Sequence, residues 1–196
     1  MNSITLDGLA GSGELWLDIM RIICGDTSDK SMVDLGCHKA PYTPLLGFKE
    51  RTYVDIQDRP LDHIVEQQYF VQSDASVFLA NNNKKYDVAI CSDVLEHLTI
   101  GNGCGLVEWM QLRSKKQIIF TPLGGFNITY DGHPDSHASG WSPDLLQACL
   151  CIILPNFHPS LGIGAFFAVR CEYWEKQRIY NEIINKYVIS GTIQTG

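Results

Sequence analysis

Three acidic residues follow three successive short apolar runs, a spacing that can build a ligand site. Each of Asp34, Asp55 and Asp74 lies at or just after the end of its run. If the runs are parallel strands, their carboxyl ends meet at one edge of a sheet, where nucleotide-like ligands bind. A carboxylate after the second strand can accept both hydrogen bonds of a ribose diol. One after the third suits an adenine amino group, and Gly36 lets the backbone approach a ligand closely.

Each of these acids also has a simpler explanation. An Asp at the end of a strand often caps a loop or stabilises a turn through its own side chain. Taken together, however, three acids after three successive strands form a polar rim along one edge. The joint pattern therefore favours a binding site over three unrelated turns.

A second group of polar residues lies in the segment 131–142, which is rich in turn-forming residues. On the predicted fold this segment follows the fifth strand and lies at the rim of the ligand site. We therefore expect His133, His137 and Trp141 to contact a substrate bound beside the first ligand. His137 is the candidate general base, with His133 as a second catalytic candidate, because a positioned base typically contributes ~10²–10⁴-fold. The alternative is that His137 and Ser139 bond the loop backbone while Trp141 packs against a helix.

The elements that position these residues alternate between short apolar runs and longer polar or helical stretches. Such spacing is typical of parallel strands joined by helical crossovers, and it predicts an α/β fold with a Rossmann-like, doubly wound sheet. A short link between the last two runs requires an antiparallel pair. The predicted strands are residues 31–36, 51–56, 68–72, 86–91 and 116–121, followed by the pair 149–155 and 164–171.

Helices are predicted at both ends of the chain. Residues 14–24 place apolar side chains on one stripe between the candidate cap Ser12 and Gly25, and residues 173–188 form a second apolar face. Shorter helices are expected at 41–48 and after Ser142. We interpret 1–196 as a single domain, with 1–30 as an N-terminal helical cap and 172–196 as a C-terminal helix and tail.

Composition limits the class of protein. The chain has 196 residues, 45% of them hydrophobic, and a formal net charge of −7, which together indicate one globular domain. The negative charge disfavours a long nucleic acid as a partner, since phosphate binding normally needs a basic surface. No apolar run approaches the ~20 residues of a membrane span, and no secretory signal is evident, so we expect a cytoplasmic protein. The seven scattered cysteines suit reduced, packed thiols.

Five segments resemble the class I S-adenosylmethionine-dependent methyltransferases, specifically the type 11 and type 12 group. The segments are Val33-Asp-Leu-Gly-Cys37, Tyr53-Val-Asp55, Ser73-Asp-Ala75, Tyr86-Asp-Val-Ala-Ile-Cys-Ser-Asp-Val-Leu-Glu-His-Leu98 and Ile118-Ile-Phe-Thr-Pro122. The resemblance implies S-adenosylmethionine as cofactor. It assigns the methionine end to Asp34 and Gly36, the ribose to Asp55, adenine to Asp74 and Ala75, and the pocket wall to Cys91 and Ser92. Cys37 and Ile56 are further expected cofactor-binding residues.

The loop after Gly36 departs from this family. The family commonly carries further glycines where His38 and Ala40 stand here. A Cβ at these positions narrows the allowed backbone, which leaves open a non-catalytic module that binds the cofactor or a nucleotide. A nicotinamide-dependent oxidoreductase ranks lower, because its phosphate loop needs three glycines between the first strand and its helix.

The segment 93–98 carries two acids and a histidine at the start of an expected helix, where Asp93 is expected to act as a cap. Our primary interpretation assigns no metal ligand. The Glu96-His97 pair also resembles a metal-dependent branch of these methyltransferases that methylates RNA 3′ ends. The alternative is therefore that Glu96, His97 and His137 bind a divalent cation.

The predicted function is transfer of a methyl group from S-adenosylmethionine to an oxygen or nitrogen of a small-molecule or sugar acceptor. Such a transfer is an in-line displacement, so the protein mainly has to align the nucleophile with the methyl carbon and exclude water. The sequence assigns neither the acceptor nor an oligomeric state.

Overall fold

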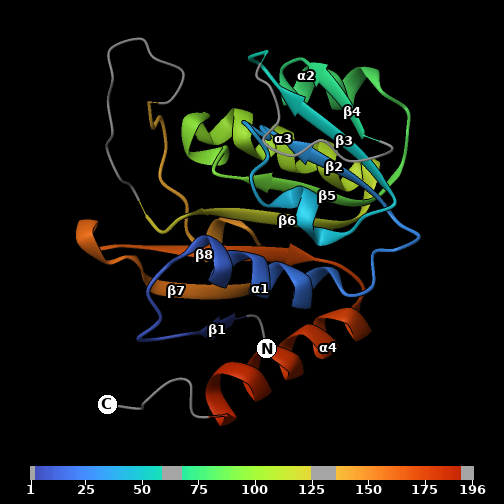
Figure 1. Ribbon diagram of the computed structural model, residues 1–196. Helices are drawn as coiled ribbons and strands as arrows, with labels where there is room; N and C mark the ends of the chain where they lie inside the picture. Colours follow the sequence, from blue (N-terminus) through green and yellow to red (C-terminus); the bar gives the residue numbers. More distant parts are fainter. Residues whose placement is uncertain (1–2, 59–67, 125–135, 191–196) are drawn as a thin grey trace.

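A twisted sheet runs through the centre of the protein and places the ends of its strands along one edge (Figure 1). The computed structural model describes residues 3–58, 68–124 and 136–190. Within these ranges the sheet has eight strands in the order β1-β7-β8-β6-β5-β2-β3-β4. The strands are β1 (Ser3–Thr5), β2 (Ser31–Leu35), β3 (Glu50–Asp55), β4 (Gln68–Gln72), β5 (Tyr86–Ser92), β6 (Ser114–Pro122), β7 (Leu150–His158) and β8 (Ile163–Arg170).

The strand directions confirm the predicted Rossmann-like sheet. The neighbours from β6 through β4 are all parallel, and β1 is parallel to β7. Only β8 runs the other way among the described strands, because it is antiparallel to both β6 and β7. The predicted mostly parallel sheet with a C-terminal antiparallel pair is therefore confirmed.

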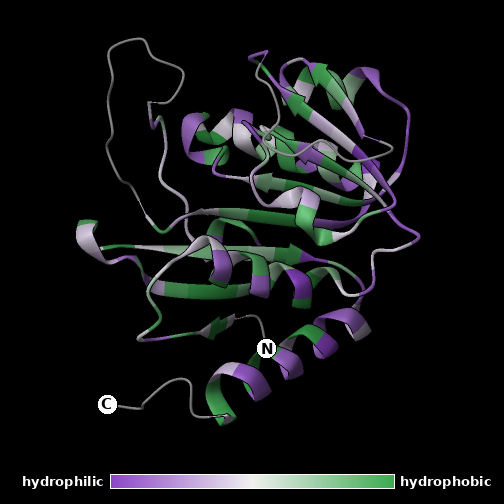
Figure 2. Ribbon diagram, in the orientation of Figure 1, coloured by the Kyte–Doolittle hydropathy of each residue, from purple (hydrophilic) through white to green (hydrophobic). Residues whose placement is uncertain are grey.

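Helices cover both faces of this sheet, as buried parallel strands require. The longer helices are α1 (Gly13–Cys24), α2 (Ala75–Asn81), α3 (Ile100–Arg113) and α4 (Tyr173–Ile183), and α4 continues as a π-helix, η5 (Ile184–Ile189). The 3-10 helices are η1 (Thr43–Leu46), η2 (Leu95–His97), η3 (Pro143–Leu145) and η4 (Pro159–Leu161). In Figure 2 the central strands are hydrophobic along most of their length, whereas the helices carry both hydrophilic and hydrophobic residues.

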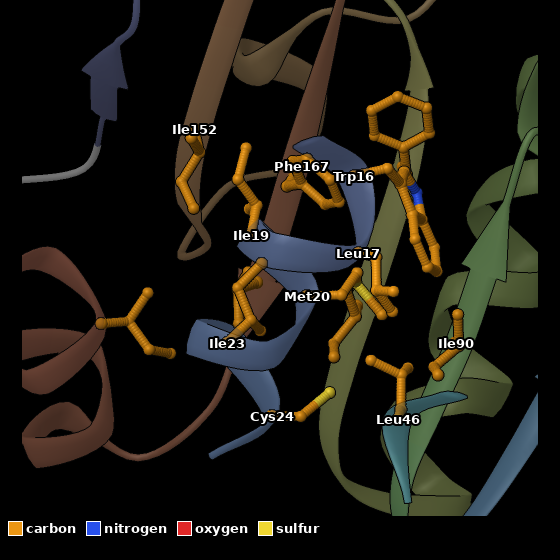
Figure 3. Packing of buried hydrophobic residues seen from close by; sticks show 14 of the residues in the cluster. Trp16, Leu17, Ile19, Met20, Ile23, Cys24, Leu46, Ile90, Ile152 and Phe167 are labelled. Atoms are coloured by element: carbon orange, nitrogen blue, oxygen red, sulfur yellow. The ribbon is translucent and has the colours of Figure 1, made fainter. Parts of the chain in front are cut away.

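Helix α1 packs on one face of the sheet. It begins where the Ser12 hydroxyl accepts the Leu15 amide at 3.1 Å, and it ends at Gly25, whose φ is 65°. Ile19 and Met20 are fully buried against the strands, as Figure 3 shows for α1 and its neighbours. Both predicted ends of this helix are thus observed.

The opposite face carries a second core built around α3 and Trp141. The indole ring lies so close to α3 that a Cβ at Gly103 would come within 2.4 Å of it. A glycine is therefore needed there for the ring to pack on the helix. Among the described residues, no helix is long and apolar enough to cross a membrane.

One local prediction was incomplete and two were wrong. Residues 1–30 contain not only a helical cap but also β1, whose three residues are too short to give a sequence pattern and which pairs with β7. The expected helix at 41–48 is only the 3-10 turn η1, which ends at Gly47 in a left-handed conformation. Ser142 makes no side-chain cap on the short helix that follows it.

Candidate functional site

A cavity of about 840 Å³ lies along the carboxyl ends of the parallel strands. Such an edge is where ligands bind in open α/β sheets. Asp34, Asp55 and Asp74 all line this cavity, although they come from three different strand ends. The structure therefore brings together the three acids that the sequence pattern singled out.

The loop after β2 forms the floor of the cavity. Gly36 has a φ of 71°, and a Cβ there would come within 2.3 Å of the Val94 side chain. His38 and Ala40 have φ values of 49° and 48°, the left-handed region that glycine favours. The backbone of this loop therefore takes up a glycine-like conformation although two positions carry side chains.

Asp55 connects this loop to the end of β3. Its Oδ2 accepts the amide of His38 at 2.8 Å, and its Oδ1 accepts the amide of Gln57 at 2.8 Å. The carboxylate is thus fixed in orientation, and each oxygen retains a lone pair that can accept another donor. Asp55 is both a turn residue and a wall of the cavity, so the two interpretations of this acid are compatible.

Asp34 is buried at the end of β2. The Thr43 hydroxyl donates to its Oδ2 at 2.7 Å. Burial raises the pKa of the Asp34 carboxyl to about 7, the Thr43 hydrogen bond opposes this rise, and the charge of Asp55 adds to it. An uncharged acid at this depth costs less to desolvate than a carboxylate.

Asp74 caps α2 while facing the cavity. Its Oδ1 accepts the amides of Ser76 and Val77 at 2.8 and 3.0 Å. Ala75, the first residue of the helix, also lines the cavity. The simpler role predicted for this acid is therefore observed, together with the position that the binding site requires.

The remaining residues assigned to the cofactor divide into two groups. Cys37, Ile56 and Ser92 line the cavity, and Ile56 is 61% exposed. Cys91 does not line it, because its side chain is fully buried on the α3 face, where burial raises the pKa of the thiol well above its usual value. The expectation that Cys91 lines the pocket was wrong, since neighbouring strand residues point to opposite faces.

The expected acceptor residues are placed differently from one another. Trp141 is 1% exposed, and its indole nitrogen donates to the Leu95 carbonyl and to Ser139, each at 2.9 Å. This placement corrects the expectation that Trp141 contacts an acceptor, because it is a satisfied core residue outside the cavity wall. Ser139 bonds the backbone of Leu95 and Leu98, as the alternative predicted. His133 lies outside the described residues.

Glu96, His97 and His137 converge beside the cavity. One potential ligand atom from each lies within 4.8 Å of the others. The Thr121 hydroxyl donates to Glu96 Oε2 at 2.9 Å, and His97 Nδ1 lies 3.3 Å from the Ser136 carbonyl oxygen. These contacts hold the carboxylate and one imidazole in place, as the residues behind metal ligands usually do.

Asp93 brings a further acid to this corner. Its φ of 54° and its position before η2 are not those of a helix cap, so that expectation was wrong. Burial raises the pKa of Asp93 to about 7, and the charge of Glu96 adds to the rise. Burial likewise raises the pKa of Glu96 to about 7. Asp93 and His97 both line the cavity.

Residues with aromatic rings that the sequence analysis did not select also line the cavity. They are Trp16, Tyr42, Phe120, Phe157 and His158. These residues are scattered along the chain and come together only because β6, β7 and α1 are neighbours in the fold. No local pattern in the sequence could have indicated this group.

The architecture is shared with crystal structures of methyltransferases. Burkholderia thailandensis 1,6-didemethyltoxoflavin-N1-methyltransferase, with 1,6-didemethyltoxoflavin and S-adenosylhomocysteine bound, matches over 82% of this chain and 78% of its own, with a TM-score of 0.60 and 14% identity. The N-methyltransferase NodS from Bradyrhizobium japonicum WM9 matches over 81% and 96%, with a TM-score of 0.60 and 14% identity. The methyltransferase domain of bacterial CtHen1 matches over 80% and 94%, with a TM-score of 0.55 and 19% identity.

These likenesses establish the fold. No protein-family model matches the sequence, and no curated protein matches it significantly. The comparisons therefore show that this chain has the Rossmann-like fold of the class I methyltransferases.

The left-handed backbone at His38 predicts a gain in stability from glycine. His38 is exposed, so a change there alters the conformational energy more than the packing. We expect His38→Gly to be more stable than His38→Ala by about 1 kcal/mol, because alanine keeps the Cβ that disfavours this conformation. Urea unfolding of both variants measures the difference. Equal stabilities would mean that the loop is not left-handed at this residue.

The raised pKa of Asp34 predicts a pH-dependent stability. Between its ordinary value of 3.8 and about 7, folded Asp34 keeps a proton that the unfolded chain releases. The raised pKa therefore adds its full contribution to the free energy of unfolding below about pH 4. This contribution is lost as the pH rises through about 7. Asp34→Asn should stabilise the protein at pH 8 and have little effect at pH 4. Unfolding in urea at both pH values tests this, and an equal effect at both would contradict it.

Proposed function

We propose that the protein binds S-adenosylmethionine and transfers its methyl group to an oxygen or nitrogen of a small-molecule acceptor. The observation that carries this proposal is the convergence of Asp34, Asp55 and Asp74 on one cavity at the carboxyl ends of β2, β3 and β4. The methyltransferase fold supports the same assignment, as does the S-adenosylhomocysteine bound in the Burkholderia enzyme of that fold.

The residues present fit an adenosyl group. Asp55 is oriented by two backbone amides and can accept the two hydroxyls of a ribose. Ile56 offers an exposed apolar surface beside it, and Asp74 follows on the next strand with one oxygen already held by α2. Asp34 and Gly36 lie toward the centre of the sheet, where the proposed methionine end would approach the backbone closely.

When bound, S-adenosylmethionine supplies an electrophilic methyl carbon. The chain's own task is then to align an acceptor atom with that carbon and to exclude water. His137 stays the candidate base, because it lies beside His97, which lines the cavity. A small-molecule acceptor is supported by the size of the cavity, which falls within the ~300–1,000 Å³ range of ligand pockets.

Cofactor binding is the direct test of this proposal. We expect isothermal titration calorimetry to detect binding of S-adenosylmethionine and S-adenosylhomocysteine. Asp55→Ala should weaken both by about 10- to 100-fold, because hydrogen bonds to a charged acceptor are lost. Asp29→Ala is the matched control, an exposed acid in the turn before β2. Absence of binding at millimolar ligand would refute the proposal, and unchanged affinity in Asp55→Ala would refute the ribose assignment.

The cluster of Glu96, His97 and His137 favours a second candidate, in which methyl transfer to a hydroxyl depends on a divalent cation. One carboxylate and two imidazoles are a donor set that suits several divalent transition metals. Because Glu96 is oriented by Thr121 and His97 by a backbone carbonyl, the chain's residues fit such an ion. A cation would also offset the repulsion between the Asp93 and Glu96 carboxylates. The acceptor hydroxyl could then be that of an RNA 3′ end, as the resemblance of this segment implies.

Binding of Mn²⁺ tests the second candidate. Titration followed by electron paramagnetic resonance should detect binding at one site in the wild type and its loss in His97→Ala. His158→Ala is the matched control, because His158 lines the same cavity but lies outside the cluster. If wild type and His97→Ala bind Mn²⁺ equally, the cluster is not the site. If methyl transfer persists undiminished in chelator, the dependence on a cation is excluded.

A further inference from the structure

Six aromatic rings make a continuous chain of contacts along one side of the cavity. The ring centroids are 5.9 Å apart for Tyr42 and Trp16, 6.5 Å for Trp16 and Phe167, 4.6 Å for Phe167 and Phe120, 5.0 Å for Phe120 and Phe157, and 4.8 Å for Phe157 and His158. Figure 3 shows Trp16 of α1 beside Phe167 of β8. Five of these six rings line the cavity, and only Phe167 lies behind them. We refer to these five as the aromatic wall.

Two glycines allow the N-terminal segment to pack closely against the aromatic wall. A Cβ at Gly11 would come within 2.1 Å of the Phe157 carbonyl oxygen, and one at Gly13 within 2.2 Å of the Tyr42 ring. The Gly11 amide donates to the same Phe157 oxygen at 2.8 Å. Glycines are therefore needed where this segment passes Phe157 and Tyr42. These close contacts fix the path of the segment.

The β6 and β7 members of the aromatic wall lie at the other end of the strand order from Asp55 and Asp74. Phe120 lies near the carboxyl end of β6, and Phe157 near that of β7. Asp55 and Asp74 follow β3 and β4, at the far end of the strand order β7-β8-β6-β5-β2-β3-β4. An adenosyl group held by the acids would therefore leave the aromatic end for a second ligand.

We propose that the aromatic wall is the acceptor subsite and that it selects a planar aromatic or heteroaromatic acceptor carrying the O or N nucleophile. This inference rests on the proposed function, because it assumes the adenosyl group at the acidic end. Flat rings gain additional attraction from offset and edge-to-face contacts with other aromatic rings. A saturated ring of similar size cannot make these contacts, although it buries as much apolar surface.

The transfer at this subsite balances without another reactant. A lone pair of the acceptor oxygen or nitrogen forms the new bond to the methyl carbon. The carbon–sulfur bond breaks at the same time, and its electron pair stays on sulfur, which becomes a neutral thioether. The proton that the acceptor loses passes to the candidate base His137 and from there to solvent.

Two matched probes test the selectivity of the wall. We expect the protein saturated with S-adenosylhomocysteine to bind 2-naphthol about two- to tenfold more tightly than its fully saturated decahydro analogue in calorimetry. Simple burial of apolar surface predicts no preference for the flat compound. Equal or tighter binding of the saturated analogue would therefore overturn the inference.

Two pairs of variants locate the probe. Tyr42→Leu removes a half-exposed ring of the wall, and Tyr173→Leu removes an exposed ring elsewhere. Phe157→Leu and Phe166→Leu each remove a buried ring, but only Phe157 lines the cavity. We expect the 2-naphthol preference to fall in Tyr42→Leu and Phe157→Leu and to stay in the two controls. A preference that falls equally in controls and wall variants would contradict the assignment.

The affinity for S-adenosylhomocysteine separates this inference from the proposed function. If S-adenosylhomocysteine binds and the probes are not discriminated, only the aromatic selectivity fails. If S-adenosylhomocysteine does not bind, both the proposed function and this inference fail.

Discussion

The Asp55 carboxylate holds the end of β3 against the loop after β2, and the shape of the cavity depends on this connection. One of its oxygens accepts the amide of His38 and the other that of Gln57. The first bond helps to hold His38 in the left-handed conformation. Glycine would adopt this conformation at low energetic cost. Here the hydrogen bond to Asp55 stabilises the same conformation at a residue that carries a side chain.

The cavity that results is uneven in charge and polarity. Acids line it where β2, β3, β4 and β5 end, and the rings of Phe120 and Phe157 line it near the ends of β6 and β7. Burial raises the pKa of Asp34 to about 7, and desolvation of the carboxyl together with the charge of Glu96 raises that of Asp93 to about 7. A positive charge nearby would favour the ionised forms of both acids. A sulfonium or a divalent cation would provide such a charge. Among the described lining residues, the aromatic end carries no Asp, Glu, Lys or Arg, and it suits the flat, apolar part of a ligand. One strand order thus produces two chemically different compartments.

Much of the fold follows from sequence patterns, whereas the site follows only in part. Seven apolar runs predicted seven of the described strands, because buried strands need apolar residues on both faces. Strand β1 gave no signal, since three residues are too few. The acids were predictable because each follows its strand directly. Cys91 and Trp141 were misplaced because the sequence does not reveal which face a residue points toward. The aromatic wall depends on contacts between residues as distant as Trp16 and Phe167, which no local spacing encodes.

The most direct measurement of the central claim is a crystal structure of the protein grown with S-adenosylhomocysteine. The account predicts density for the ribose within hydrogen-bonding distance of the Asp55 carboxylate. It places adenine beside Asp74 and Ala75, and the sulfur toward the centre of the sheet. Density for the ligand at the aromatic end, or an acidic end that stays empty at saturating ligand, would contradict it.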